Sequence, residues 1–258
     1  MNRLRISIIQ KDLVWEDKDI NLSVFGDAIK SLRGTTDVVV LPETFTTGFS
    51  MNADYLAEDD QGKTIQTVKY WAETCNLAVC GSFIASEGEK FYNRSFCITP
   101  HDAYYYNKRH LFRMGGEQDV FSSGEDVTIF SYKGWNIRLA VCYDLRFPVW
   151  LRNKGNEYDL LILSANWPEA RNSVWETLLK ARAIENQSYV CGVNRIGDDS
   201  NGIRHAGNSL LIDYKGNPVA SAGAHQENVL TVEIDKESLD RFRIKFPAWK
   251  DADRFEIE

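Results

Sequence analysis

The chain has 258 residues, and its 43% apolar content is enough to fill a substantial core, which excludes an intrinsically disordered protein. Its 30 lysines and arginines against 37 aspartates and glutamates give a net charge of −7, opposite in sign to most nucleic-acid-binding proteins. No apolar run approaches the roughly 18 residues that span a bilayer, and the first residues lack a signal-peptide core. We therefore expect a cytoplasmic protein that binds neither nucleic acid nor membrane.

The chain shows no internal division. Its six prolines are scattered, and no low-complexity tract, charge block or linker separates two halves, so we expect one domain over residues 1–258. The cysteines include no CxxC pair, which favours neither a disulfide framework nor a thiolate metal site. We expect five reduced thiols and no metal: Cys75, Cys80, Cys97, Cys142 and Cys191.

Short apolar runs bounded by polar or turn residues recur along the chain. They are rich in Val, Ile and Leu and mostly do not alternate, which is typical of strands covered on both faces. Six runs predict such strands: residues 4–9, 37–41, 77–83, 137–142, 159–163 and 189–194. Residues 91–107 and 207–234 instead indicate strand after strand with turns between them.

Helical periodicity lies between several of these runs. Two segments each place apolar side chains on one face: Leu22, Phe25, Ala28, Ile29 and Leu32 in the first, and Val174, Leu178, Ala181 and Ile184 in the second. The alternation of strands and helices predicts an α/β layered protein with a mixed sheet.

Reactive residues directly after a buried strand are site candidates, because ligands of α/β proteins bind beyond the carboxyl ends of the strands. Glu43 closes DVVVLPE, Cys142 closes IRLAVC, and Asn166 with Trp167 follows DLLILSA. Cys142 precedes LRFPVWLRN, in which we expect a helix whose positive dipole end and free N–H groups favour a thiolate. The alternative is a buried core cysteine.

A thiol nucleophile needs a general base, which is usually a histidine. His110 and His205 are candidates among the four histidines, although neither lies in a papain-like or caspase-like signature. Glu43 is the other candidate, because burial beside an apolar wall raises the pKa of a carboxyl group; a surface or capping role is its alternative. Lys108 and Glu117, each taken alone, are typical of solvated charges.

Several common site types are missing from the sequence. It contains no GxxxxGK[ST] phosphate loop, no GxGxxG after a strand, no GxSxG elbow and no HExxH. Hydrolysis without a cofactor is the chemistry that remains easiest to build, so we expect no cofactor.

Four segments resemble, in the same order, the catalytic motifs of the nitrilase superfamily of carbon–nitrogen hydrolases. LPETFTTGF resembles the first glutamate motif, NKRHLF the lysine motif, GGEQDVFSSG the second glutamate segment and RLAVCYDLRFP the cysteine elbow. The similarity extends through SANWP, KARAIENQSYV and KFPAWKDADRF, essentially over the whole chain. CYDLRFPVW and FPAWKDADRF most resemble the bacterial omega-amidase branch, which acts on 2-oxoglutaramate. Val149 departs from the broader amidase pattern, which often has Glu at this position.

The resemblance implies a catalytic set of Glu43, Lys108, Glu117 and Cys142. Cys142 would attack the amide to form a thioester, and Glu43 would pass the proton to departing ammonia and then activate water. Lys108 and the backbone N–H of Tyr143 would hold the oxyanion, and Glu117 would orient Glu43 or Lys108.

The resemblance also implies a fold, an assembly and a substrate pocket. The fold is a four-layer α-β-β-α sandwich of two mixed sheets flanked by helices. Relatives dimerise through helices that correspond to the segment after Cys142 and to residues 174–187, which implies a homodimer or higher homo-oligomer; ordinary core packing is the alternative for these apolar faces. Phe45 and Trp167 are candidate walls for a short acyl chain, and Arg171 is a candidate partner for a carboxylate.

Four functional hypotheses remain open. The first is an omega-amidase acting on small 2-oxo dicarboxylic acid monoamides, namely 2-oxoglutaramate and 2-oxosuccinamate. The second is another hydrolase of the superfamily, either an aliphatic amidase, an N-carbamoyl amino acid hydrolase or a nitrilase. The third is a Cys–His thiol hydrolase, which requires His110 or His205 as base, and the fourth is a catalytically silent scaffold.

Overall fold

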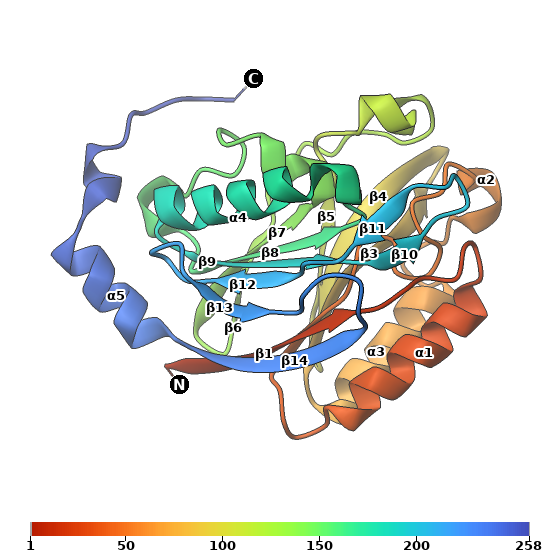
Figure 1. Ribbon diagram of the computed structural model, residues 1–258, viewed down its shortest axis with the longest axis horizontal. Helices are drawn as coiled ribbons and strands as arrows, with labels where there is room; N and C mark the ends of the chain where they lie inside the picture. The colour runs from red at the N-terminus through yellow and green to blue at the C-terminus, as the bar shows by residue number, and fades with distance from the viewer. Residues whose placement is uncertain (1, 258) are drawn as a thin grey trace.

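Two mixed β-sheets form the middle of the molecule (Figure 1). The structure is a computed structural model and describes residues 2–257. The first sheet contains β1 (Arg3–Gln10), β2 (Val38–Val40), β3 (Ala78–Glu87), β4 (Lys90–Ile98), β5 (Ala103–Asn107) and β14 (Asn228–Asp235), in the order β14-β1-β2-β3-β4-β5. The second contains β6 (Ile129–Tyr132), β7 (Trp135–Val141), β8 (Leu160–Ala165), β9 (Tyr189–Asn194), β12 (Leu210–Ile212) and β13 (Pro218–Ser221), in the order β13-β12-β9-β8-β7-β6.

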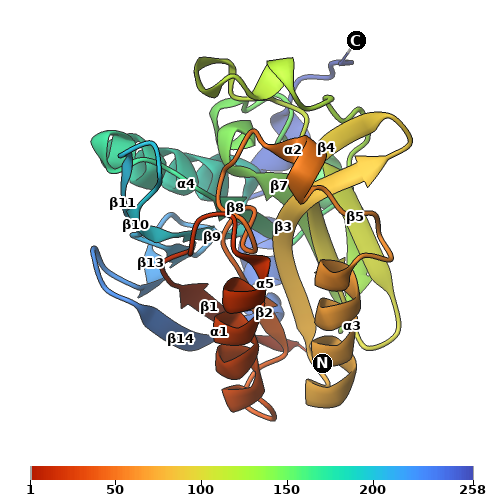
Figure 2. The same ribbon diagram turned by 90° about the vertical axis from the view of Figure 1, so that its right-hand side faces the viewer.

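Helices cover the outer faces of both sheets. Helices α1 (Lys18–Ser31) and α3 (Lys63–Cys75) lie side by side on the first sheet, and α4 (Asn172–Asn186) lies on the second (Figures 1 and 2). The layers therefore run helix, sheet, sheet, helix, which confirms the predicted four-layer sandwich.

Several smaller elements lie outside these layers. A hairpin of β10 (Ile196–Asp198) and β11 (Arg204–Ala206) follows β9, α2 (Ala53–Leu56) precedes α3, and α5 (Lys236–Lys245) follows β14. Within residues 2–257, no helix combines the length and the apolar character that a membrane crossing requires.

The apolar runs of the sequence reflect strands that bury both faces. On β2, Val38 and Val40 belong to the core shared with the second sheet, whereas Val39 belongs to the core beneath α1 and α3. On β1, Ile8 and Ile9 divide between the same two cores. Successive side chains of a strand point to opposite faces, so a central strand between two cores needs apolar residues at every position.

The two predicted helix faces have different outcomes. On α1 the predicted face is buried, and the Asp17 side chain caps the helix by accepting from the Ile20 N–H at 3.0 Å. On α4 the predicted face is only partly buried: Val174 and Leu178 pack against the core and Ile184 is 54% exposed, while the fully buried face carries Trp175, Leu179 and Ala183. The apolar pattern of this helix is wide enough to fit two faces, and contact with the sheet selects the face that carries the larger tryptophan ring.

The predicted helix after Cys142 is also wrong. A short 3₁₀ turn, Cys142–Arg146, is followed by further turns rather than by an α-helix. Pro148 lacks an N–H and disfavours helical backbone at Phe147, whose φ and ψ are −112° and 87°.

Gly192 on β9 provides the room that α4 needs against the second sheet. A Cβ atom built at this position would lie 2.7 Å from Leu179 Cδ2 and 2.9 Å from Trp175 Cζ2. We expect Gly192→Ala to lower the free energy of unfolding by about 1–3 kcal/mol through overpacking. Urea unfolding followed by circular dichroism measures this, and an unchanged midpoint would contradict the close packing described here.

Candidate active site

The carboxyl ends of β2 and β8, one from each sheet, are joined by hydrogen bonds. The Ser164 hydroxyl donates to the Leu41 carbonyl at 2.8 Å. The Asn166 N–H donates to Glu43 Oε2 at 2.7 Å, and the Asn166 side chain donates to the Glu43 carbonyl at 2.7 Å. These bonds fix the Glu43 carboxylate at the junction of the two sheets.

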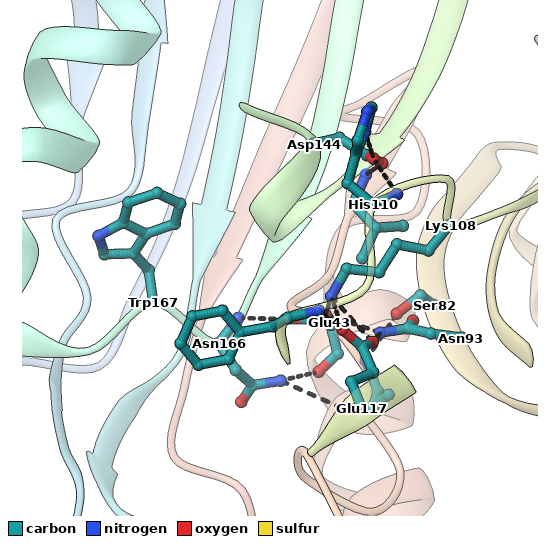
Figure 3. Close-up of polar contacts among 12 residues, drawn as sticks. Glu43, Ser82, Asn93, Lys108, His110, Glu117, Asp144, Asn166 and Trp167 are labelled. Carbon is teal, nitrogen blue, oxygen red and sulfur yellow. Dashed lines mark hydrogen bonds and ion pairs between the residues drawn. The ribbon is translucent and has the colours of Figure 1, made fainter. Parts of the chain in front are cut away.

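A buried ammonium bridges the two predicted glutamates (Figure 3). Lys108, which follows β5, donates from Nζ to Glu43 Oε1 at 2.9 Å and to Glu117 Oε1 at 3.0 Å. None of the three side chains is more than 1% exposed. Charges this deeply buried are stable only when they are paired and hydrogen-bonded, and each partner here satisfies the others.

Asn93 on β4 is a member of this network that the sequence analysis missed. Its Nδ2 donates to Glu43 Oε1 at 2.7 Å and to Glu117 Oε1 at 3.1 Å, and its carbonyl accepts from the Lys108 N–H at 3.0 Å. The signal for it was a polar residue with a small side chain inside the strand-like stretch FYNRSFCI. Asn93 thus holds the two carboxylates and the lysine backbone together.

The pKa shifts of the network follow from burial and pairing. Burial raises the pKa of Glu117, Lys108 opposes this rise, and the nearby Glu43 carboxylate adds to it. For Lys108, burial alone lowers the pKa, but the charges of Glu117 and Glu43 outweigh burial and raise it. The lysine therefore remains an ammonium ion at neutral pH.

Cys142 opens the turn after β7 with a left-handed backbone, at φ 41°. Such a conformation is uncommon for a residue with a side chain and clusters at functional sites. Asp144 fixes this turn, because its Oδ2 accepts from the Val141 N–H at 3.0 Å and from the Tyr106 hydroxyl at 2.8 Å. Asp144 Oδ1 accepts from the His110 N–H at 3.0 Å, which ties the cysteine turn to the segment that follows Lys108.

The surroundings of Cys142 do not favour the predicted thiolate. Burial raises the pKa of the thiol well above its usual value, and the Glu43 carboxylate raises it further. Lys108 and the Asn166 backbone N–H lower it, but by less. The thiol is therefore protonated at neutral pH, and it lies near a carboxylate that can accept the proton.

The two candidate histidine bases lie in different environments. His110 is bound to Asp144, with Nδ1 and Oδ1 2.9 Å apart, and stacks on Phe147 at a centroid distance of 3.7 Å. It is not among the residues that line the cavity next to Cys142, whereas His205 is.

A cavity of about 540 Å³ opens at the sheet junction. Its lining includes Glu43, Lys108, Cys142 and Tyr143 together with Trp167, Arg171 and Arg146. Glu117 lies behind Lys108 and does not line the cavity. A cavity of this volume suits a small-molecule substrate with a short acyl chain rather than a protein substrate.

Phe45 is not a wall of this cavity, contrary to the sequence prediction. It is fully buried beneath α1 and α3, where its ring packs edge-on against Phe25 and Phe96 at centroid distances of 5.5 and 6.0 Å. Between Glu43 and Phe45, Thr44 has φ 43°, and this bend separates the polar site from the core. Within residues 2–257, no group of three or more His, Cys, Asp or Glu side chains could hold a metal ion.

Comparisons with known proteins identify the family of this chain. Residues 5–244 match the family model "Carbon-nitrogen hydrolase". The chain is 43% identical over 260 residues, covering 100% of both chains, to the omega-amidase YafV of Escherichia coli. It is 32% identical over 251 residues to the 2-oxoglutaramate amidase of Bacillus subtilis, covering 95% of this chain and 96% of that one.

A solved structure extends the likeness to three dimensions. XC1258 of Xanthomonas campestris, described as a CN-hydrolase superfamily protein with an arsenic adduct in the active site, superimposes with a TM-score of 0.97. The two chains are 41% identical, and the match covers 100% of both. A cysteine turn and a buried Glu–Lys–Glu network, in a chain that matches the family model almost from end to end, place this protein in the carbon–nitrogen hydrolase family.

Proposed function

We propose that this protein is an omega-amidase, which hydrolyses the terminal amide of small 2-oxo dicarboxylic acid monoamides such as 2-oxoglutaramate and 2-oxosuccinamate. The observation that carries the proposal is one small cavity that joins a thiol, a carboxylate and an ammonium to two arginines. Full-length similarity to an omega-amidase and to a 2-oxoglutaramate amidase supports it.

In the proposed reaction, Cys142 Sγ attacks the amide carbon while Glu43 accepts the thiol proton. The Lys108 ammonium and the Tyr143 N–H stabilise the oxyanion, and Glu43 then gives the proton to the amide nitrogen as ammonia leaves. This produces a thioester. Glu43 next takes a proton from water, whose oxygen attacks the thioester carbon. The C–S bond then breaks, Glu43 returns the proton to the Cys142 sulfur, and the acid is released.

The protonated state of Cys142 explains why the site needs Glu43 so close. A thiol with a raised pKa is a weak nucleophile until its proton is removed. The three donors around Glu43, which are Asn93, Lys108 and the Asn166 N–H, aim its carboxylate at the cavity. XC1258 carries an arsenic adduct in its active site, and arsenic binds thiols, which is consistent with a reactive cysteine in this family.

Two arginines give the cavity a charge that suits an anionic substrate. The Cζ atom of Arg171 lies 5.3 Å from the centroid of the Phe112 ring, and that of Arg146 lies 5.1 Å from the centroid of the Trp167 ring. Neither guanidinium forms an ion pair with a carboxylate of residues 2–257. A guanidinium stacked on a ring keeps its in-plane N–H groups free for a carboxylate, and we assign the substrate carboxylate to Arg171 with Arg146 beside it.

The Cys–His alternative has less support. A histidine base requires a ring nitrogen within reach of the thiol, but the Nδ1 atom of His110 is held by Asp144, whose side chain also anchors the cysteine turn. Of the three candidate bases, Glu43, His110 and His205, only Glu43 acts on the pKa of the Cys142 thiol.

We further propose a cytoplasmic homodimer. Beside its buried face, α4 carries Val174, Leu178 and Ala181, which are partly exposed although the first two also pack against the core, and the exposed Ile184 continues this stripe. An apolar stripe beside the sheet-facing side of a helix suits a second subunit.

The catalytic assignment predicts that Cys142→Ala, Glu43→Gln and Lys108→Met each lower ammonia release from 2-oxoglutaramate by about 10³-fold or more, because each removes a group used in the transition state. Cys75→Ala, a thiol at the end of α3 outside the cavity, serves as the matched control and keeps normal turnover. A Cys142→Ala enzyme with wild-type turnover would refute the mechanism.

The hydrogen bonds of Asn93 to Glu43 and Glu117 predict that this residue positions the two carboxylates. Asn93→Leu removes donors to both glutamates, and we expect kcat to fall by about 10–100-fold while KM changes little. The acidic limb of the pH–rate profile should also move to higher pH. Loss of the Asn93 donor favours the protonated form of a glutamate that it contacts, which raises the pKa of that carboxyl group. A slower enzyme with an unmoved profile would indicate a purely structural role.

The assignment of the substrate carboxylate to Arg171 predicts that this residue favours anionic over uncharged amides. Arg171→Met should lower kcat/KM for 2-oxoglutaramate by about 10–100-fold, mainly through KM, because a charged hydrogen bond to the carboxylate is lost. Hydrolysis of an uncharged amide such as butyramide should change less than about threefold. Equal losses on both amides would contradict the assignment.

The proposed dimer predicts that Leu178→Glu yields a monomer, because a charge on the apolar stripe resists burial at an interface. Light scattering after size-exclusion chromatography measures the mass of both forms. A monomeric wild-type protein would overturn this assembly.

A further inference from the structure

The β10–β11 hairpin forms a wall of the cavity that the mechanism above does not use. Its residues Asp199, Asn201, Ile203 and His205 line the cavity. Arg195, which is fully buried, anchors the hairpin by donating from Nη2 to Asp12 Oδ1 at 2.5 Å and from Nε to the Ile196 carbonyl at 2.9 Å. The hairpin is therefore a fixed part of the cavity and can present a side chain to a bound substrate.

His205 is the buried polar group on this wall. The side chain is only 3% exposed, and its Nδ1 atom, which solvent does not reach, has no hydrogen-bond partner within residues 2–257. A hydrogen bond from this ring into the cavity would therefore come from Nε2. Buried polar atoms without a partner destabilise a folded protein. Such atoms also occur away from the cavity, for example Trp135 Nε1 and Ser188 Oγ, but His205 is one that lines it. Asn166 Oδ1 is a second such atom on the cavity lining, but it belongs to the residue that already holds Glu43.

The environment of His205 keeps the imidazole uncharged. Burial lowers the pKa of His205 to about 4, and the neighbouring Arg195 guanidinium contributes to the fall. Asp199, the Gly197 backbone and Glu43 favour the protonated form, but their effect is smaller. At neutral pH the ring therefore offers one N–H donor and one acceptor without a charge.

A neutral donor suits a neutral acceptor on the substrate. The carboxylate is assigned to guanidinium groups, which bind anions more strongly than a neutral imidazole does. The reacting amide oxygen is assigned to Lys108 and Tyr143. In the proposed substrate class, the acceptor that remains is the uncharged oxygen of the 2-oxo group.

We propose that His205 is a specificity-determining residue that hydrogen-bonds the 2-oxo oxygen of the acyl chain. This inference rests on the proposed omega-amidase function. It adds a hydrogen bond that distinguishes 2-oxo acid monoamides from amides that have a methylene group in place of the 2-oxo carbon. A site built to hydrogen-bond one substrate oxygen discriminates strongly against an analogue that lacks it.

The test compares two substrates that differ only at this carbon, 2-oxoglutaramate and the monoamide of glutaric acid. His205→Leu removes the polar atoms at similar size, His205→Gln keeps a neutral donor and acceptor, and Arg204→Gln alters the exposed neighbouring residue on β11 as a control. We expect His205→Leu to lower kcat/KM for 2-oxoglutaramate about tenfold or more and for the glutaric monoamide less than about threefold. His205→Gln should recover part of the loss, and Arg204→Gln should match the wild type.

Inhibition by the two dicarboxylate products gives a readout that does not depend on acylation. In His205→Leu the inhibition constant of 2-oxoglutarate should rise by about the same factor as the loss in kcat/KM, while that of glutarate stays constant. Equal effects on both substrates and both products, or a lowered melting temperature with unchanged selectivity, would overturn the proposal in favour of a structural role.

The wild-type enzyme separates failure of this inference from failure of the proposed function. If the wild type releases no ammonia from 2-oxoglutaramate, the omega-amidase proposal itself is wrong, and the inference fails with it. If the wild type prefers 2-oxoglutaramate and His205→Leu keeps the same preference, only the role of His205 is wrong.

Discussion

The buried ion pairs of Lys108 are the constraint on which the rest of the site depends. One ammonium faces two carboxylates, Glu43 and Glu117, and all three side chains are shielded from water. Removing one partner of a buried pair leaves an uncompensated charge, which costs about 3–5 kcal/mol. The protein therefore holds these groups in one arrangement before any substrate arrives, and a preorganised charge can act on the transition state without reorganising.

The sandwich supplies that arrangement because the two sheets bring distant segments to one junction. Glu43 and Lys108 follow strands of the first sheet, while Cys142 and Asn166 follow strands of the second. Asp144 joins the cysteine turn to the lysine segment through His110 and Tyr106. The thiol is consequently held near the Glu43 carboxylate although burial raises the pKa of the thiol. In the proposed mechanism this carboxylate removes the thiol proton, a role for which the sequence had suggested a helix dipole.

Much of this arrangement could be predicted from the sequence, for identifiable reasons. Central strands such as β2 carry apolar residues at every position, and four ordered motifs identify the residues that meet at the junction. Phe45 was misplaced because a chain that bends at Thr44 turns the next side chain into the core, which strand position alone does not reveal. Asn93 was missed because its role arises from contacts with residues 24 and 50 positions away. The buried face of α4 also depends on tertiary packing, which periodicity leaves open.

The most direct test of the account is detection of the acyl-enzyme. Wild-type protein is mixed with 2-oxoglutaramate, quenched in acid within the first turnover, and examined by intact-protein and peptide mass spectrometry. We expect a mass increase equal to the substrate less ammonia, located on the peptide that contains Cys142 and absent from Cys142→Ala. Ammonia release without any such adduct, or an adduct on another residue, would contradict a mechanism in which Cys142, Glu43 and Lys108 act as one site.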